Sequence, residues 1–254
     1  MTRITFLLAI AAAPVLLAGA SAQAAPAGTI KNVVLVHGAF ADGSGWKPVA
    51  DILARDGYKV SVVQHPETSL EDDVAATNRV LDALDGPAVL VGHSYGGMVI
   101  SGAGANPHVK SLVYVAAFMP EVGDTLVSLQ ASNPPAGKGI APTKDGAYLL
   151  INPAVFHADF AADLPQAQSD FMALSQVPLS VKSASGQIAA PAWKTKPSYA
   201  IVATEDRSIN PDLERSMYKR AHAVTTEVKG SHVIYISQAR FVADTIEKAA
   251  LAAQ

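Results

Sequence analysis

The sequence predicts an α/β fold, with a mostly parallel, doubly wound sheet of about six strands and an inserted helical cap. Short runs of Val, Leu and Ala are apolar at nearly every position, which is typical of strands buried on both faces of a sheet. Stretches with helical periodicity alternate with these runs, as they do when helices connect parallel strands. The alternation stops between residues 120 and 197, where no strand is predicted.

Most of the predicted elements have the apolar spacing of a buried strand or of one helix face. The predicted strands are Val33–Val36, Val60–Val63, Ala88–Val91, Leu112–Ala117, Tyr199–Ala203 and Val224–Val228. The predicted helices are Trp46–Arg55, Asp72–Leu84, Met98–Ala105, Pro211–Ala221 and Ser237–Ala252. Asn210 and Pro211 are typical of a helix N-cap and first turn, and they set the start of the fourth helix.

The segment from about 120 to 197 is predicted to form the cap. Pro is frequent there, and short helical patches occur at Ala161–Leu164 and Ser169–Leu174. The alternative is a loose surface excursion, but apolar side chains such as Phe156, Phe160 and Trp193 favour a packed unit. A cap at this place would cover a site and shape its pocket.

An apolar run preceded by one positive charge opens the chain. Arg3 comes before Phe6–Ala18, and Ala22 and Ala24 are the small residues that a signal-peptidase site needs. We therefore expect a signal peptide over residues 1–24 and export to the periplasm or the extracellular space. The mature domain, 25–254, would have no stable membrane anchor. A retained anchor is the alternative, but the run is shorter than the roughly 20 residues that span a bilayer.

The composition excludes several partners and chemistries. The chain has 19 basic and 22 acidic residues, a net charge of −3 and no basic patch, so no nucleic-acid partner is expected. It has no Cys, which excludes a Cys nucleophile, disulfides and thiolate metal sites. No group of His and acidic residues has metal-ligand spacing, and we predict neither a metal nor a cofactor. The oligomeric state stays open.

The strongest motif is Gly-x-Ser-x-Gly, formed by Gly92, Ser94 and Gly96. It follows the predicted strand Ala88–Val91 and precedes a predicted helix. In this setting the motif forms a turn so tight that both flanking positions must be Gly, and the Ser hydroxyl is lifted above the sheet edge. The motif therefore predicts Ser94 as the nucleophile of an acyl-transfer reaction.

A nucleophilic Ser needs a base, usually His, and an acid that orients the base. His232 lies after the last predicted strand, at the sheet edge where ligands bind in open α/β folds. His222 ends a predicted helix and is interpreted as a solvated residue. Asp206 is the preferred acid, with Glu205 the close alternative and Asp124 a more remote one.

Backbone N–H groups are predicted to form an oxyanion hole. One donor would be Ala39, on the loop after the first strand, with Phe40 as the alternative; the other would be Tyr95. His37 and His93 flank the site and are expected to orient loops rather than to transfer protons.

Together these stretches resemble the α/β-hydrolase superfamily. The matching segments, in the expected order, are Val34–Ala39, Gly92–Gly97, Ala203–Asp206 and Gly230–His232. More narrowly, the chain is similar to the branch of plant methyl esterases, hydroxynitrile lyases and small bacterial esterases, over nearly all of the mature chain. The lyases of that branch carry a Thr at the position of Gly38 and a Lys at that of Val233. Related dehalogenases and epoxide hydrolases have an Asp in place of Ser94.

The motifs and the resemblance predict a serine hydrolase that cleaves carboxylic esters of small, largely apolar substrates through an acyl-enzyme intermediate. Ser94, Asp206 and His232 would form the triad. A lactonase, hydroxynitrile lyase or perhydrolase with the same triad is one alternative. A ligand-binding module of the same fold with little turnover is another.

Overall fold

The computed structural model describes residues 30–253. The predicted signal peptide, residues 1–24, lies outside the described residues. Between residues 30 and 253 no helix combines the length and the apolar character needed to cross a membrane.

The central sheet has six strands, all paired in parallel, in the order β2-β1-β3-β4-β8-β9. Their bounds are β1 Asn32–Val36, β2 Lys59–Val63, β3 Ala88–Ser94, β4 Val109–Ala117, β8 Ser198–Ala203 and β9 Val224–Val228. All six predicted strands are therefore confirmed. The inner strands β1 and β3 are buried at every position, whereas the edge strand β9 is exposed at Val224, Thr225 and Glu227. Burial on both faces explains the continuous apolar runs.

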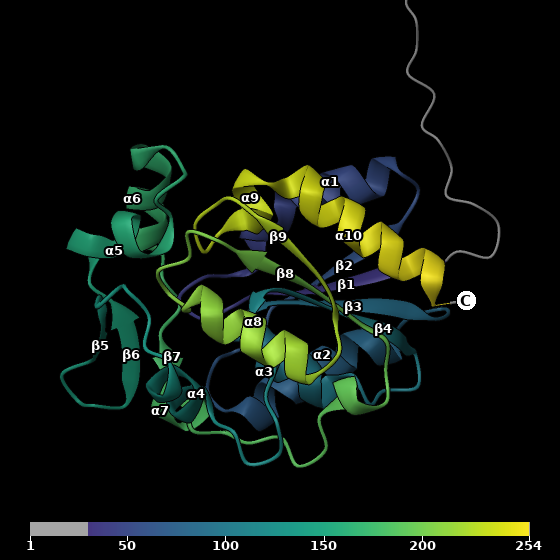
Figure 1. Ribbon diagram of the computed structural model, residues 1–254, viewed down its shortest axis with the longest axis horizontal. Helices are drawn as coiled ribbons and strands as arrows, with labels where there is room; N and C mark the ends of the chain where they lie inside the picture. Colours follow the sequence, from purple (N-terminus) through teal and green to yellow (C-terminus); the bar gives the residue numbers. More distant parts are fainter. Residues whose placement is uncertain (1–29, 254) are drawn as a thin grey trace, which may run out of the picture.

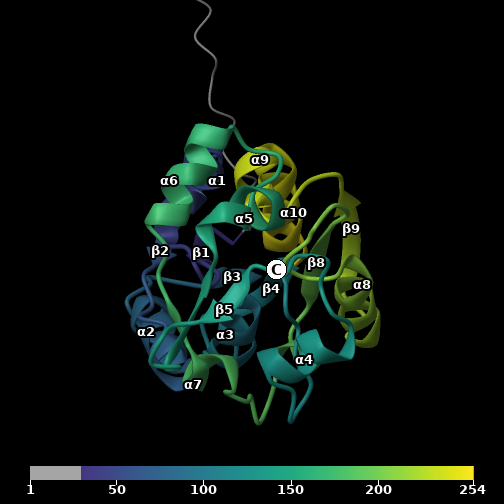
Figure 2. The same ribbon diagram turned by 90° about the vertical axis from the view of Figure 1, so that its left-hand side faces the viewer.

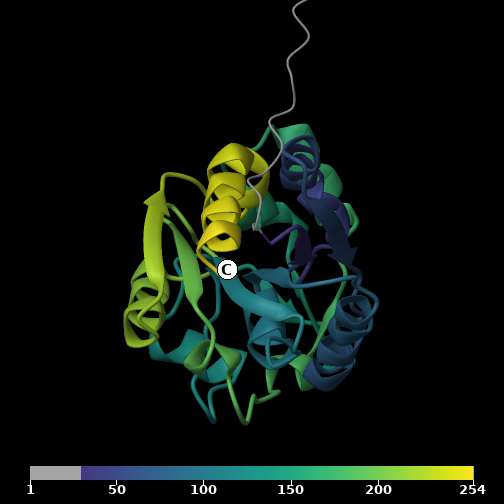
Figure 3. The same ribbon diagram turned by 90° about the vertical axis from the view of Figure 1, so that its right-hand side faces the viewer.

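Helices cover both faces of this sheet (Figures 1 and 3). One layer contains α1 Lys47–Arg55, α9 Ile234–Ser237 and α10 Ala239–Ala252; the other contains α2 Leu70–Asp82, α3 Gly96–Ala103 and α8 Pro211–Arg220. The five predicted helices are confirmed, although the last begins at Ala239, after the short α9. The start of α8 is as predicted, because the Asn210 side chain accepts the Asp212 N–H and Pro211 occupies the first turn.

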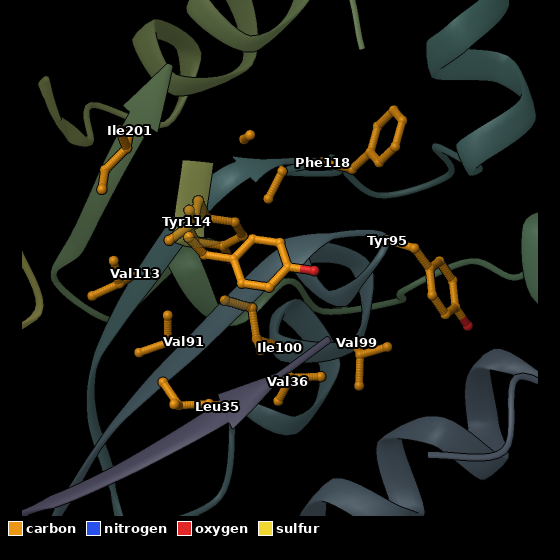
Figure 4. Close-up of a cluster of buried hydrophobic side chains, with 14 of the residues drawn as sticks. Leu35, Val36, Val91, Tyr95, Val99, Ile100, Val113, Tyr114, Phe118 and Ile201 are labelled. Atoms are coloured by element: carbon orange, nitrogen blue, oxygen red, sulfur yellow. The ribbon is translucent and has the colours of Figure 1, made fainter. Parts of the chain in front are cut away.

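The core lies between the inner strands and their helices (Figure 4). Leu35, Val91 and Val113 come from three neighbouring strands and are fully buried, as is Ile100 of α3. Tyr114 is also fully buried, and its hydroxyl is paired with the Ser101 hydroxyl at 2.9 Å. Such a core fixes the ends of the strands from which the site loops start.

The cap lies between β4 and β8 in the chain, and it faces the viewer in Figure 2. Its helices are α4 Leu126–Ser132, α5 Pro153–Phe160, α6 Gln166–Leu174 and α7 Val181–Ala184, followed by the 3-10 turn Ala192–Lys194. Phe156 and Phe160 are buried, so the cap is packed rather than loose.

Two details of the cap differ from the sequence prediction. It contains a small antiparallel sheet of β5 Ile140–Pro142, β6 Tyr148–Ile151 and β7 Leu179–Ser180, whereas no strand was expected. These strands have two to four residues each, too few to show a periodicity. The predicted helical patch Ala161–Leu164 is wrong, because it is a turn between α5 and α6. Pro165 follows this turn and disfavours a helical backbone at the residue before it.

Close backbone packing around α3 gives a stability prediction. A Cβ at Gly97 would lie 2.0 Å from the Phe118 carbonyl oxygen. We expect Gly97→Ala to destabilise the fold by at least about 2 kcal/mol, which lowers Tm by roughly 4–8 °C in a domain of this size. Thermal unfolding followed by circular dichroism measures this. Gly86→Ala is the control, because its only neighbour within 4 Å is Asn32 Nδ2 at 3.7 Å. Equal Tm values for the two variants would contradict the prediction.

Candidate active site

Ser94 lies at the end of β3, on a sharp turn into α3. Its φ of +52° is in the left-handed region, which is strained for a residue with a side chain. A Cβ at Gly92 would lie 2.5 Å from the Gly96 carbonyl oxygen, and a Cβ at Gly96 would lie 2.6 Å from the His37 carbonyl oxygen. Both motif glycines are thus required by close approach of backbone, and the second one packs α3 against the end of β1.

His232 and Asp206 form a buried pair. His232 Nδ1 lies 2.5 Å from Asp206 Oδ2, and the two side chains are almost inaccessible to solvent. The other carboxylate oxygen, Oδ1, accepts the N–H groups of Ser208 and Ile209 at 2.7 and 2.9 Å. These backbone donors fix the carboxylate, and a hydrogen bond at Nδ1 leaves Nε2 as the free ring nitrogen.

The structure separates the alternative acids and bases from this pair. Glu205 is exposed and lies 3.5 Å from Lys229, and Asp124 lies 3.3 Å from Arg220. His222 is exposed at the end of α8. Asp206, rather than Glu205 or Asp124, is therefore the carboxylate that contacts His232.

The predicted oxyanion donors lie beside Ser94 and His232, and two of them come from the loop after β1. Ala39, Phe40 and Tyr95 line one cavity together with Ser94 and His232. Within residues 30–253, the N–H groups of Ala39 and Tyr95 donate to no protein acceptor. Phe40 has a left-handed φ of +64°, so this loop, like the turn at Ser94, carries backbone strain.

This cavity has a volume of about 130 Å³ and is mainly apolar. It is lined by Ala39, Phe40, Ser94, Tyr95, Phe118, Leu126, Val127, Gln130, Ile140, Leu149, Phe160, Leu179, Ser208 and His232. Many of these belong to the cap, which therefore closes over Ser94. The set contains no Asp, Glu, Lys or Arg, and the Gln130 amide already donates to the Ser208 carbonyl at 3.2 Å. Such a lining suits an uncharged group.

A second cavity, of about 200 Å³, is also lined by Phe40. Its walls include Tyr235 and Ile236, which follow His232, and Phe171 and Met172 of α6, but not Ser94. Although it is the larger of the two, it contains none of the predicted catalytic side chains. Phe40 is the one residue that lines both cavities.

A buried polar cluster lies at the loop after β1, and the sequence does not predict it. His37, His65 and Glu67 have potential metal-binding atoms within 4.8 Å of one another. The two rings, however, are stacked at 3.7 Å with an angle of 12° between their planes. A metal ion lies in the plane of the imidazole that binds it, so one ion cannot serve two stacked rings.

The hydrogen bonds of this cluster instead support the loop. His65 Nε2 donates to the His37 carbonyl and His37 Nδ1 donates to the Gly38 carbonyl, both at 3.0 Å. Burial, and secondarily the neighbouring His65, lower the pKa of His37 to about 3, so its ring is neutral. Tyr95 is held from the same side, because its hydroxyl donates to Asp73 at 2.6 Å.

Two further contacts hold His232. His93 Nε2 donates to the His232 carbonyl at 2.9 Å, which agrees with the expected loop-orienting role of His93. The ring of Phe160, at the end of α5, packs edge-on against the His232 ring with centroids 5.0 Å apart. The sequence gives no sign of the second contact, because Phe160 is one of many apolar residues in the cap.

A model of the alpha/beta hydrolase family matches residues 33–245 of this chain. One curated relative is the carbendazim hydrolyzing esterase of Nocardioides sp. (strain SG-4G), which is 37% identical over 113 residues. The match covers 39% of this chain and 46% of that protein, so it spans about half of the relative's length.

Solved structures share the fold. A pyrethroid hydrolase from Sphingobium faniae JZ-2 superposes with a TM-score of 0.74 and 23% identity, covering 88% of this chain and 98% of that chain. Tomato methylketone synthase I, complexed with 2-tridecanone, gives a TM-score of 0.77 and 19% identity, covering 88% and 99%. These likenesses confirm the predicted fold. The family model matches residues 33–245, which is most of the chain. The chain therefore belongs to the alpha/beta hydrolase family.

Proposed function

We propose that this protein is a serine hydrolase that cleaves carboxylic esters of small, largely apolar substrates through an acyl-enzyme intermediate. One observation carries the proposal: Ser94 and His232 line the same cavity, and Asp206 holds His232 from behind at 2.5 Å. A nucleophile, a base and an orienting acid in this arrangement are what acyl transfer through a serine requires.

In the proposed reaction, Ser94 Oγ attacks the ester carbonyl while His232 Nε2 accepts its proton. Asp206 holds the ring by accepting the Nδ1 hydrogen and stabilises the imidazolium that forms. The Ala39 and Tyr95 N–H groups stabilise the oxyanion. His232 returns the proton to the leaving alcohol, and then activates the water that releases the acid.

The cavity and the relatives support the substrate class. The absence of charged side chains among the cavity residues favours an uncharged acyl or alcohol group. The curated relative is named as an esterase that hydrolyses carbendazim, which is consistent with ester-type chemistry in this chain.

A close contact disfavours the cyanohydrin lyase alternative. A Cβ at Gly38 would lie 2.6 Å from Ser94 Cβ and 2.9 Å from His93 Nδ1. The Thr that the lyases carry at this position would therefore need a shifted loop. Val233, where those enzymes have a Lys, is fully buried. No comparable observation favours the lactonase, the perhydrolase or the binding module.

A second buried carboxyl group, that of Glu214, lies close to Asp206. Glu214 of α8 is fully buried, and its Oε2 accepts the Ala203 N–H at 3.2 Å. Burial, followed by the charge of Asp206 and a hydrogen bond to it, raises the pKa of Glu214 well above its usual value. The raised pKa favours the protonated form of Glu214, which reduces its charge repulsion with Asp206.

We also propose that the enzyme is exported. Arg3, the apolar run Phe6–Ala18 and the small residues Ala22 and Ala24 support cleavage of a signal peptide. N-terminal sequencing of the protein recovered from the periplasm or medium tests this.

The first functional prediction concerns the nucleophile. Ser94→Ala removes the attacking oxygen, and we expect kcat for short p-nitrophenyl esters to fall by at least about 10⁴-fold. Loss of labelling by a fluorophosphonate probe should accompany the loss of turnover. Ser132→Ala, at an exposed cap residue, is the control and should keep wild-type activity. Turnover of Ser94→Ala at the wild-type rate would refute the proposed function.

Replacement of Glu214 is expected to change the pH dependence of stability. Its raised pKa means that the folded state binds this proton more tightly than the unfolded state. The resulting stability is fully present below the unfolded pKa and is lost as pH rises above it. Glu214→Gln mimics the protonated acid without titrating. We therefore expect its stability relative to wild type to increase by up to about 1.4 kcal/mol per pH unit above roughly pH 4.5.

Urea unfolding of both proteins from pH 4 to pH 8 measures this difference. The two proteins should have similar pH dependence at the acidic end, and Glu214→Gln should retain activity. A stability difference that is the same at every pH would show that Glu214 is not protonated in the folded state.

A further inference from the structure

Asp163, in the turn between α5 and α6 of the cap, reaches across to the loop that carries His232. Its Oδ2 accepts the Ser231 N–H at 2.9 Å and its Oδ1 accepts the Ser231 hydroxyl at 2.5 Å. Oδ2 also accepts the Ser237 hydroxyl at 2.7 Å. Ser231 immediately precedes His232, and Ser237 ends α9, the helix that follows it. One carboxylate therefore binds the chain on both sides of His232.

All of these donors come from the His232 loop or from the short helix α9 that follows it. Within the part of the chain that the structure describes, Asp163 has no Lys, Arg or His partner. Its carboxylate therefore makes hydrogen bonds to this segment and no ion pair. Hydrogen bonds to a charged acceptor are roughly twice as strong as neutral ones. A carboxylate with three donors from one segment is therefore suited to fixing that segment.

The preceding helix, α5, touches both site loops. Its Phe160 packs against the His232 ring, and the Phe160 carbonyl lies 3.4 Å from the Ser231 hydroxyl. On the loop of Asp206, the Ser208 hydroxyl donates to the Asp159 carbonyl at 2.8 Å, and Arg207 Nε lies 3.3 Å from Asp159 Oδ1. The cap is thus bonded to the loops of both His232 and Asp206.

We propose that Asp163 is a positioning residue for the proposed hydrolase: through Ser231 and Ser237 it fixes the loop of the base His232. The cap then has a part in the reaction besides forming the pocket. This inference rests on the proposed function, in which His232 transfers the proton of Ser94. A misplacement of about 1 Å at a reacting group can cost about 10²-fold in rate.

The test compares Asp163→Ala, Ser237→Ala and the double variant with wild type. Asp163 is exposed, so its replacement leaves no buried charge without a partner and the variants should fold. We expect Asp163→Ala to lower kcat for p-nitrophenyl acetate by about 10- to 100-fold, with KM within about threefold of wild type. The double variant should be no slower than Asp163→Ala, because Ser237 acts through the same carboxylate.

Asp170→Ala is the matched control. Asp170 is an exposed Asp on α6. Within residues 30–253 its side chain bonds only to Gln166 on the same helix, at 2.6 Å. Its kcat, KM and Tm should equal those of wild type. The Tm of Asp163→Ala should stay within a few degrees of the control, which separates a positioning effect from a loss of the fold.

Three results would overturn the inference. They are a kcat of Asp163→Ala equal to that of Asp170→Ala, an effect on KM alone, or additive losses in the double variant. The failure of the proposed function looks different: wild type would then neither hydrolyse the ester nor be labelled at Ser94 by a fluorophosphonate. In that case both proposals fall, whereas an active wild type with an unaffected Asp163→Ala refutes only the positioning role.

Discussion

The tight backbone turn at Ser94 is the constraint on which the rest of the site depends. Its left-handed φ of +52° persists because the glycines around it let main chain pack on main chain. Gly96 packs against the backbone after β1, and Gly97 packs against the backbone after β4. Three neighbouring strands therefore end at one point. The same packing places the start of α3 and, with it, the N–H of Tyr95 beside the Ser94 side chain.

The two other site loops are held differently. Those of Asp206 and His232 follow β8 and β9, at the far side of the sheet, and no run of glycines fixes them. Hydrogen bonds from their surroundings do so: backbone N–H groups hold Asp206, and His93 holds the His232 carbonyl. Further contacts come from Phe160 of α5 and from Asp163 of the cap. The site thus combines one half built by close main-chain packing with another that depends on side-chain hydrogen bonds.

This division explains what could be predicted from the sequence. The six strands and Ser94 were predicted, because buried strands are continuous apolar runs and the turn needs glycines at fixed spacing. The choice between Asp206 and Glu205 needed coordinates, since neighbouring residues on one loop differ only in direction. Asp163 could not be found at all. It lies 68 residues from Ser231, and a contact between an exposed Asp and a Ser leaves no pattern in a single sequence.

Phe40 lines both the cavity of Ser94 and a larger cavity, and its backbone is in the left-handed region. Among the described residues, Phe40 is the one shared by the two linings, and it is neither the nucleophile nor part of the acid–base pair. A substitution at this position changes the walls of both cavities, while the residues proposed for the chemistry stay as they are. In a family whose members act on many different compounds, this makes Phe40 a natural position for divergence, and a first position to randomise in directed evolution.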